Sequence, residues 1–146
     1  MILFNTTRTE EDDTLLINEL VGKPFSFFEA IKMGGVGSGR FIIESASRGF
    51  YSVLKTPSDL NYLNIELRPM GVILHFTQQL KRYAWVIPYR KLVIYNTKTF
   101  GLHSDNIFLE LRKNQLFKSN MPFIEKMLSM RLKYLNKYKF YDRPRN

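Results

Sequence analysis

Apolar and polar residues alternate one by one through the middle of the chain. Between positions 61 and 68, Leu63, Ile65 and Leu67 take every second place, with polar side chains between them. A repeat of two places one set of side chains on each face of a β-strand, so this segment predicts a strand with one buried face. The alternation resumes at residues 72–78 after a Pro-Met-Gly sequence, which predicts a tight turn and a β-hairpin.

Similar short apolar segments recur from residue 40 to residue 112, separated by turn-forming residues. Short strands at such regular spacing are typical of a β-sandwich or barrel. We therefore expect a mainly β fold. The seven predicted strands are residues 40–46, 50–55, 61–68, 72–78, 82–87, 91–97 and 106–112.

The hydrophobic repeat changes to three or four residues near the carboxyl end. Asn120 is a suitable N-cap, and Pro122 suits the first turn of a helix. We expect this helix to face the core and to cover an open end of the β-structure, where it would shield apolar side chains and strand edges. Its apolar stripe consists of Ile124, Leu128, Leu132 and Leu135, widened by Met127, Met130 and Tyr134.

The first 39 residues are set apart from the predicted strands. Residues 14–21 fit either a short helix, with acidic residues at its amino end, or an extra strand. Residues 25–33 predict a helical turn that packs on the body of the protein. We divide the chain into an N-terminal extension with a glycine-rich connection (1–39), a β-barrel with its helix (40–138) and a basic tail (139–146).

Four of the eight glycines cluster at positions 34, 35, 37 and 39. A phosphate-binding loop needs a strand before its glycines and a helix after them, whose free N–H groups and positive dipole end face the anion. Here Phe41, Ile42 and Ile43 predict a strand after the glycines, and the Lys-Ser/Thr ending of a P-loop is missing. We interpret the cluster as a flexible connection or a turn with positive φ.

The composition is that of a folded domain, since 45% of the 146 residues are hydrophobic and 14% are aromatic. The chain has no cysteine, which excludes disulfides, thiolate metal sites and a cysteine nucleophile. After three apolar positions the chain runs into acidic residues, the opposite of a signal peptide's basic start and longer apolar core, and no apolar run reaches the roughly 18 residues of a membrane-spanning helix. We expect a cytoplasmic protein without a transmembrane segment.

The charge is unevenly distributed along the chain. The net charge is +9, yet in the first 20 residues Arg8 stands against five acidic residues, so the remainder is strongly basic. The positive electrostatic field of this basic part attracts the phosphates of nucleic acid, anionic lipid headgroups or an acidic protein. The alternative, which the sequence leaves open, is that the charge serves only solubility.

The final segment, RLKYLNKYKFYDRPRN, combines cations with aromatic residues. Cations neutralise phosphates while aromatic rings stack on bases or enter a membrane interface, so the mixture fits RNA, single-stranded DNA or an anionic bilayer. A structural interpretation is also open, in which the tyrosines pack a helix and the lysines solvate it. The candidate residues for an anionic partner are Arg131, Lys133, Lys137, Lys139, Arg143 and Arg145.

Residue types suited to catalysis or metal binding are few. His75 and His103 have neither the spacing of zinc ligands nor an adjacent pair of carboxylates. His103, Ser104 and Asp105 contain the residue types of a hydrolytic triad, but no nucleophile elbow surrounds the serine, and we interpret them as a polar turn. We expect no enzymatic activity, no metal and no cofactor.

Seven strands followed by a carboxyl-terminal helix, together with the sequence WVIPYRKLVIY at residues 85–95, resemble small bacterial pleckstrin-homology-like (PH-like) domains. In that family an Ile-Pro-Tyr or Ile-Pro-Trp step precedes an apolar strand. The resemblance covers residues 40–138 and implies a PH-like barrel or roll capped by the helix. It further implies that the domain serves binding or scaffolding rather than catalysis. Eukaryotic relatives bind phosphoinositides through basic residues between the first two strands, where this chain has Ser47–Gly49 with Arg48 as the single cation.

Two alternatives remain at this stage. A lipocalin-like barrel also combines about eight strands with a carboxyl-terminal helix, but its Gly-x-Trp entry is missing, because the single tryptophan is Trp85. Such a barrel would carry a small apolar ligand in its cavity, or use that cavity as an enzyme. The binding module would engage an anionic partner, another protein, or a second copy through an exposed sheet edge.

Overall fold

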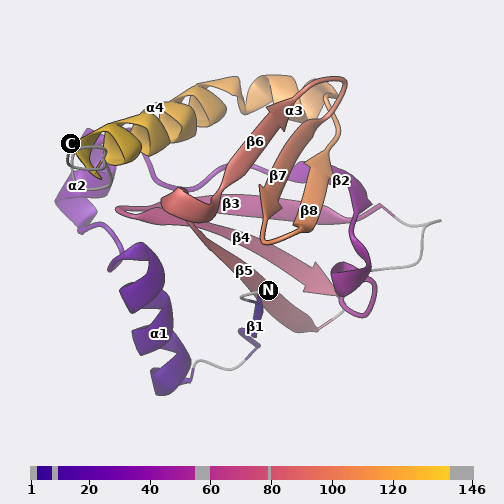
Figure 1. Cartoon of the computed structure of the whole chain (residues 1–146), viewed down its shortest axis with the longest axis horizontal. Helices are drawn as coiled ribbons and strands as arrows, with labels where there is room; N and C mark the ends of the chain where they lie inside the picture. Colours follow the sequence, from indigo (N-terminus) through magenta and orange to yellow (C-terminus); the bar gives the residue numbers. More distant parts are fainter. Residues whose placement is uncertain (1–2, 8–9, 55–59, 79, 139–146) are drawn as a thin grey trace, which may run out of the picture.

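The chain folds into one antiparallel sheet of eight strands with helices at its ends and on its outer face (Figure 1). The structure, a computed structural model, describes residues 3–7, 10–54, 60–78 and 80–138. The strands are β1 (Leu3–Asn5), β2 (Phe41–Ala46), β3 (Tyr62–Arg68), β4 (Gly71–Gln78), β5 (Lys81–Pro88), β6 (Val93–Asn96), β7 (Phe100–Ser104) and β8 (Ile107–Leu111). The helices are α1 (Glu11–Val21), α2 (Phe27–Lys32), α3 (Gln115–Ser119) and α4 (Met121–Tyr138), with short 3₁₀ helices η1 (Arg48–Phe50) and η2 (Tyr89–Lys91).

Strand β2 joins the two halves of the sheet, whose strand order is β1-β5-β4-β3-β2-β8-β7-β6. It pairs with β3 through Phe41 and Ile42, and with β8 from Ile43 to Ala46. A register shift between Ile43 and Ser45 marks an irregularity that bends a strand. The prediction of a mainly β fold with a carboxyl-terminal helix is confirmed, and the sheet is open at its edge strands β1 and β6.

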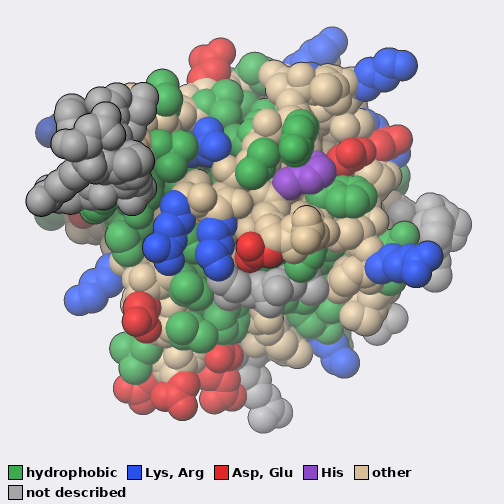
Figure 2. Space-filling model, viewed as in Figure 1, with side chains coloured by type: hydrophobic (Ala, Val, Ile, Leu, Met, Phe, Trp, Pro, Cys, Tyr) green, Lys and Arg blue, Asp and Glu red, His purple; other side chains and the backbone are tan. Residues whose placement is uncertain are grey.

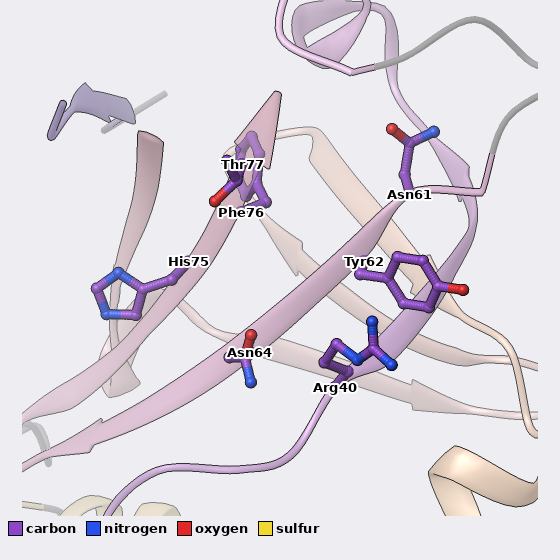
Figure 3. A pocket seen from close by; sticks show the side chains of 7 residues that line it. All are labelled: Arg40, Asn61, Tyr62, Asn64, His75, Phe76 and Thr77. Atoms are coloured by element: carbon purple, nitrogen blue, oxygen red, sulfur yellow. The ribbon is translucent and has the colours of Figure 1, made fainter. Parts of the chain in front are cut away.

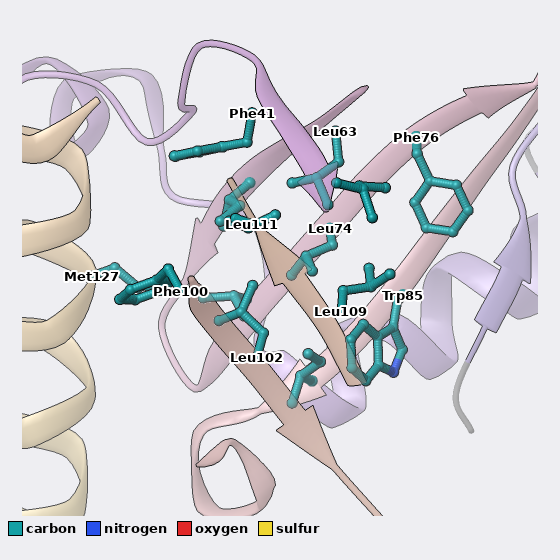
Figure 4. Packing of buried hydrophobic residues seen from close by; sticks show 14 of the residues in the cluster. Phe41, Leu63, Leu74, Phe76, Trp85, Phe100, Leu102, Leu109, Leu111 and Met127 are labelled. Atoms are coloured by element: carbon teal, nitrogen blue, oxygen red, sulfur yellow. The ribbon is translucent and has the colours of Figure 1, made fainter. Parts of the chain in front are cut away.

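The apolar faces of the two halves meet in the main core (Figure 4). On β3, Leu63, Ile65 and Leu67 are at most 1% exposed, so the predicted alternation is confirmed. The β3–β4 hairpin is also confirmed, with Arg68 opposite Gly71 across the turn. Figure 4 shows side chains of both halves and of α4 packing together, among them Leu74, Trp85, Phe100, Leu102, Leu109, Leu111 and Met127.

The prediction of a strand at residues 50–55 is wrong. Phe50 ends η1, and the N–H groups of Val53 and Leu54 donate to its carbonyl oxygen, so the backbone turns helically. Phe50 and Val53 are both buried, which shows that their apolar spacing belongs to a turn of helix on the core rather than to a strand. The connection from β2 to β3 therefore runs from Ser47 to Asn61 instead of ending at Gly49.

Two strands were not predicted, β1 and β7. Strand β7 follows the alternation rule, because Phe100 and Leu102 are fully buried, but it is short and lies among turn-forming residues. Strand β1 pairs with the edge of β5, with Leu3 opposite Trp85. The predicted strand 91–97 is shortened at its start, because η2 occupies the residues up to Lys91.

The carboxyl-terminal helix is confirmed as α4, preceded by the short helix α3. The Asn120 carbonyl oxygen accepts the Ile124 N–H, while its side chain accepts from the Gly39 N–H and donates to the Arg40 carbonyl oxygen. The buried stripe runs through Phe123, Ile124, Met127, Met130 and Tyr134. The inclusion of Leu132 in the stripe is wrong, since its side chain is 57% exposed: it lies on another side of the helix from Met130 and Tyr134.

The open choice for residues 14–21 is decided in favour of a helix. Ile17 and Val21 of α1 pack on the outer face of the sheet, against Ile73, Ala84 and Val86 of β4 and β5, and form a second apolar cluster. The spacing of these apolar residues fits both a helix and a strand. The outer face of the sheet offers an apolar surface on which a helix can pack, and this favours the helix. Helix α2 confirms the predicted helical turn, but none of its residues is buried.

The glycine cluster connects α2 to β2, as interpreted from the sequence. Gly34 and Gly35 have φ values of 77° and 97°, and their N–H groups donate to the carbonyl oxygens of Ile31 and Ala30 at the end of α2. A left-handed backbone of this kind is the usual helix ending for glycine. None of the helices in the described part of the chain is long and apolar enough to cross a membrane.

Candidate functional site

A groove of about 420 Å³ lies between the end of α4, the segment before α2 and the β3–β4 turn. We call it the α4 groove. Two lysines flank its apolar and aromatic surface, and none of the described residues that line it is a carboxylate. Its lining residues are Phe25, Pro69, Met70, Met130, Lys133, Tyr134, Lys137 and Tyr138.

The aromatic wall of the α4 groove is anchored in the core. Tyr134 packs at 5.6 Å between ring centres on Tyr89, which is fully buried, and Tyr138 packs at 4.6 Å on Tyr134, one helical turn further on. The Lys137 ammonium lies 5.7 Å from the centre of the Tyr138 ring. Rings spaced by four residues meet on one helix face, so the periodicity of α4 builds this wall.

The turn that forms the floor is held by backbone hydrogen bonds. The Met70 N–H donates to the Val21 carbonyl oxygen at the end of α1, and the Tyr89 N–H donates to the Met70 carbonyl oxygen. The Tyr89 hydroxyl donates to the Arg68 carbonyl oxygen at 3.2 Å. Burial raises the pKa of Tyr89 well above its ordinary value, so this hydroxyl keeps its proton and its role as a donor.

The structure describes three of the six predicted binding residues, and these three do not share one environment. Lys133 and Lys137 line the α4 groove. Arg131 instead donates from Nε and Nη2 to the Leu92 carbonyl oxygen, at 3.2 and 2.9 Å, and so ties α4 to the residue that follows η2. The other three, Lys139, Arg143 and Arg145, lie outside the described residues.

Two cations that the sequence analysis did not single out add to this surface. Arg90 and Lys91 belong to η2, which contacts α4, and both are exposed. Lysine and arginine side chains gather over this region in Figure 2, while acidic side chains gather at the foot of α1. One carboxylate approaches the cations, since Asp105 lies 3.7 Å from the Lys91 ammonium. Both cations stand in the Tyr-Arg-Lys sequence, but the sequence analysis did not select them because Lys91 was assigned to the predicted strand 91–97.

A second polar cluster lies on the outer face of β3 and β4. The Glu66 carboxylate accepts from Arg68 Nε through one oxygen and bonds His75 Nε2 at 2.8 Å through the other. The Arg68 guanidinium also donates to the Asn18 side chain and to the Gly22 carbonyl oxygen, at 3.0 and 2.8 Å. Arg68 therefore links the sheet to α1, and Glu66 holds Arg68 and His75 with its two oxygens.

A shallow pocket of about 340 Å³ borders this cluster (Figure 3). Arg40 lies over the Tyr62 ring at 4.6 Å from its centre, so its cation is already in contact with a protein group. Asn64 and His75 lie opposite each other on β3 and β4, and both line the pocket. The described lining residues, which include the Thr77 hydroxyl, offer hydrogen-bonding groups to a ligand.

The Glu66 cluster makes stability depend on pH. Burial by itself raises the pKa of Glu66, but hydrogen bonds from His75 and Arg68 and the charge of Arg68 outweigh it, so the pKa lies below its ordinary value. A carboxyl with a depressed folded pKa stabilises the native state while it is ionised. We expect this contribution in full above the ordinary carboxyl pKa of about 4.3, and its loss as the pH falls through the lower folded pKa.

Glu66→Gln tests this expectation in urea unfolding between pH 3 and 7. The variant should lose about 1–3 kcal/mol of unfolding free energy at neutral pH and should lack the part of the acid dependence that Glu66 supplies. Glu44→Gln is the matched control, because the ion pair of Glu44 with Arg112 is about half exposed. A Glu66→Gln curve parallel to wild type across the acid range would contradict the assignment.

His103, Ser104 and Asp105 have the side-chain types of a hydrolytic triad but do not form one. His103 lies on β7 rather than in a turn, stacks on Phe108 at 5.2 Å and meets the edge of Tyr95 at 4.6 Å. Asp105 and Asn106 form the β7–β8 turn with positive φ values of 52° and 65°, as a tight hairpin turn requires. Within the described part of the chain, no three His, Asp or Glu residues come together in a way that could hold a metal ion.

Comparisons with protein-family models, with curated proteins and with solved structures find no match to this chain. A function must therefore be argued from its own residues. The α4 groove is the place where a predicted signal, cations interleaved with aromatic residues, coincides with a surface hollow. We take it as the candidate binding site.

Proposed function

We propose that this chain is a non-catalytic binding module of the PH-like class that engages an anionic partner through the α4 groove. The observation that carries the proposal is that Lys133 and Lys137 flank an apolar and aromatic hollow, with no carboxylate among its described lining residues. Arg90 and Lys91 extend the same sign of charge along η2. Cations beside aromatic rings favour a partner that offers negative charge and apolar or ring surface together.

The order of elements supports the PH-like class. Strands β2 to β8 are seven antiparallel strands in succession, and the helix that follows them, α4, packs on the core between the two halves. The Ile-Pro-Tyr step on which the resemblance rests has a structural role here, because Tyr89 is buried and bonded to the β3–β4 turn. Strand β1 and helices α1 and α2 belong to the N-terminal extension, which the resemblance does not cover.

The packing of the interior favours surface binding over a ligand carrier. Phe50 lies 5.0 Å from Trp85 and 6.1 Å from Phe76 between ring centres, and each of these side chains is at most 4% exposed. A carrier would need a hollow where these rings meet. The groove at α4 lies on the surface instead, where a large partner has access.

Binding tests of Lys133→Ala/Lys137→Ala measure the proposal directly. Wild-type protein is titrated with phosphatidylglycerol vesicles, with single-stranded RNA and with an acidic polypeptide between 50 and 300 mM NaCl. We expect binding to at least one of them that weakens with salt, and a loss of about thirtyfold in the double variant, because each lysine at an anionic surface contributes about 1 kcal/mol.

The matched control is Lys98→Ala/Lys118→Ala, which removes the same charge from two exposed positions outside the groove. Screening limits the reach of an exposed charge to about 8 Å at physiological salt, so this control should bind nearly as well as wild type. Equal losses in the two double variants would show that net charge alone is responsible. Wild-type protein that binds none of the three anionic probes would contradict the proposed function.

A further inference from the structure

Helix α2 presents an apolar surface to solvent. Phe27, Phe28 and Ile31 are 74%, 81% and 61% exposed, and we call them the α2 apolar face. Single exposed apolar residues are ordinary on protein surfaces, but three large ones within five positions form a contiguous patch of the kind that marks an interaction site. The two phenyl rings also contact each other edge to face at 5.9 Å.

This helix is held by its ends rather than by burial. Ser26 and Glu29 form a capping box in which the Ser26 side chain accepts the Glu29 N–H and the Glu29 side chain accepts the Ser26 N–H. Gly34 and Gly35 end the helix in the left-handed conformation. Since the fold gains no core packing from the α2 apolar face, these side chains remain available for a surface outside the chain.

The α2 apolar face adjoins the α4 groove. Phe25, two residues before α2, lines the groove with Lys133 and Lys137. Beyond the other end of α2, the Lys126 ammonium donates to the Gly35 carbonyl oxygen at 3.0 Å. Helix α2 therefore lies beside α4, as Figure 1 also shows.

Cations and carboxylates both lie near α2. Lys23 precedes the helix, Lys32 is its last residue, and both are exposed, while the one carboxylate on α2, Glu29, is engaged in the capping box. Three acidic residues of α1 stand in its first turn, at the opposite end of that helix from α2, and the exposed Glu19 stands near the end closer to α2 (Figure 1). Positive charge is added by α4, whose Lys126, Lys133 and Lys137 stand on the side that adjoins α2.

We propose that the α2 apolar face inserts into the interfacial layer of an anionic lipid bilayer, while the lysines around it and in the α4 groove contact the headgroups. This inference rests on the proposed function and names its partner. Apolar and aromatic side chains ringed by lysine are the chemistry that holds a protein in the plane of an anionic membrane interface. The long lysine side chains reach the headgroups while the apolar side chains lie deeper.

Two other occupants fit the surface less well. A second copy related by two-fold symmetry would bring the same patch to both sides of the interface, so the surrounding lysines would face lysines. A nucleic acid would stack on Phe27 and Phe28, but the aliphatic Ile31 offers no ring to a base. A bilayer accepts both aromatic and aliphatic side chains.

The experiment uses the full chain with vesicles of phosphatidylcholine, alone or with 30% phosphatidylglycerol. In Phe28→Trp, the new indole should shift its emission to the blue on binding the anionic vesicles and should be quenched by brominated lipid chains. The natural Trp85 is 1% exposed and gives a constant background, which wild-type protein measures. In co-sedimentation, Phe27→Ser/Phe28→Ser should bind the anionic vesicles at least tenfold more weakly than wild type.

Leu80→Ser is the matched control, since Leu80 is 92% exposed and lies in the β4–β5 connection, away from α2. It should bind like wild type, and circular dichroism should show all variants folded. Anionic vesicles that bind without a shift of the Phe28→Trp emission would overturn insertion while leaving the electrostatic function intact. Binding of RNA but not of vesicles would also overturn it, whereas failure of every anionic probe would remove the proposed function itself.

Discussion

Replacing Gly71 by alanine is expected to lower the free energy of unfolding by about 2–4 kcal/mol. Gly71 begins β4 opposite Pro88 of β5, at the point where the end of α1 closes on the sheet. A Cβ atom at Gly71 would collide with the Ile87 carbonyl oxygen, and it would lie 2.5 Å from Val21 Cγ1 and 2.9 Å from Pro88 Cα. Two of these neighbours are backbone atoms, so the added methyl group has to displace a strand.

Gly37→Ala is the control for Gly71→Ala. No atom lies within 4 Å of a Cβ built on Gly37, and its φ is outside the left-handed region, so alanine should be neutral or slightly stabilising there. Thermal and urea unfolding of the two variants give the comparison. A loss of less than 1 kcal/mol in Gly71→Ala would mean that β4, β5 and α1 are packed less closely at this corner than described.

The second large effect is expected for Arg68→Met, which should cost about 3–5 kcal/mol. The Arg68 side chain is only 10% exposed, and it serves Glu66, the Asn18 side chain and the Gly22 carbonyl oxygen. Methionine has a similar length and preserves much of the packing, but it donates no hydrogen bond. The cost arises because a partly buried carboxylate and two acceptors lose their donor.

Arg112→Met is the matched control, since Arg112 pairs with Glu44 in the same way but both side chains are more than 40% exposed. A pair that water can solvate contributes about 0–1 kcal/mol. Urea unfolding at neutral pH should therefore separate the two arginines clearly. Equal losses would show that burial and the extra acceptors add nothing to the Arg68 pair.

Both large effects concern the corner that supports the candidate site. The Met70 N–H bonds the Val21 carbonyl oxygen, and Arg68 bonds the Gly22 carbonyl oxygen, so the end of α1 and the β3–β4 turn are joined there. Met70 and Phe25 then form part of the α4 groove. A variant that loosens this corner without unfolding the chain is expected to weaken binding as well as stability.

Hydrophobic repeats along the chain predicted those elements that have one buried face and one more exposed face. The alternation of β3 and β4 and the longer repeat of α4 each arise because one face is buried along most of the element. The same rule failed at residues 50–55, where Phe50 and Val53 are buried on a helical turn. It also missed β7, whose five residues are as many as those of the predicted β8 but include only two large apolar side chains, Phe100 and Leu102.

The candidate site was predictable only in part. The mixture of cations and aromatic residues near the carboxyl end predicted Lys133 and Lys137 as contacts of an anionic partner, and the structure places both beside a hollow that the sequence did not indicate. The sequence does not distinguish these two lysines from Arg131, whose guanidinium donates a hydrogen bond to the Leu92 carbonyl oxygen. The contribution of Phe25 and of η2 depends on segments far apart in the chain, for which a single sequence carries no spacing signal.

By itself the sequence determined a mainly β chain with a carboxyl-terminal helix, an acidic start and a basic remainder, because periodicity and composition act along the chain. Only the tertiary structure decided that residues 14–21 form a helix, that Arg131 is a structural residue and that α2 lies beside α4 with its phenylalanines uncovered. The physical reason is that an apolar residue lowers its free energy against any apolar partner. Which partner it meets, and whether it meets one at all, is set by how distant segments pack in three dimensions.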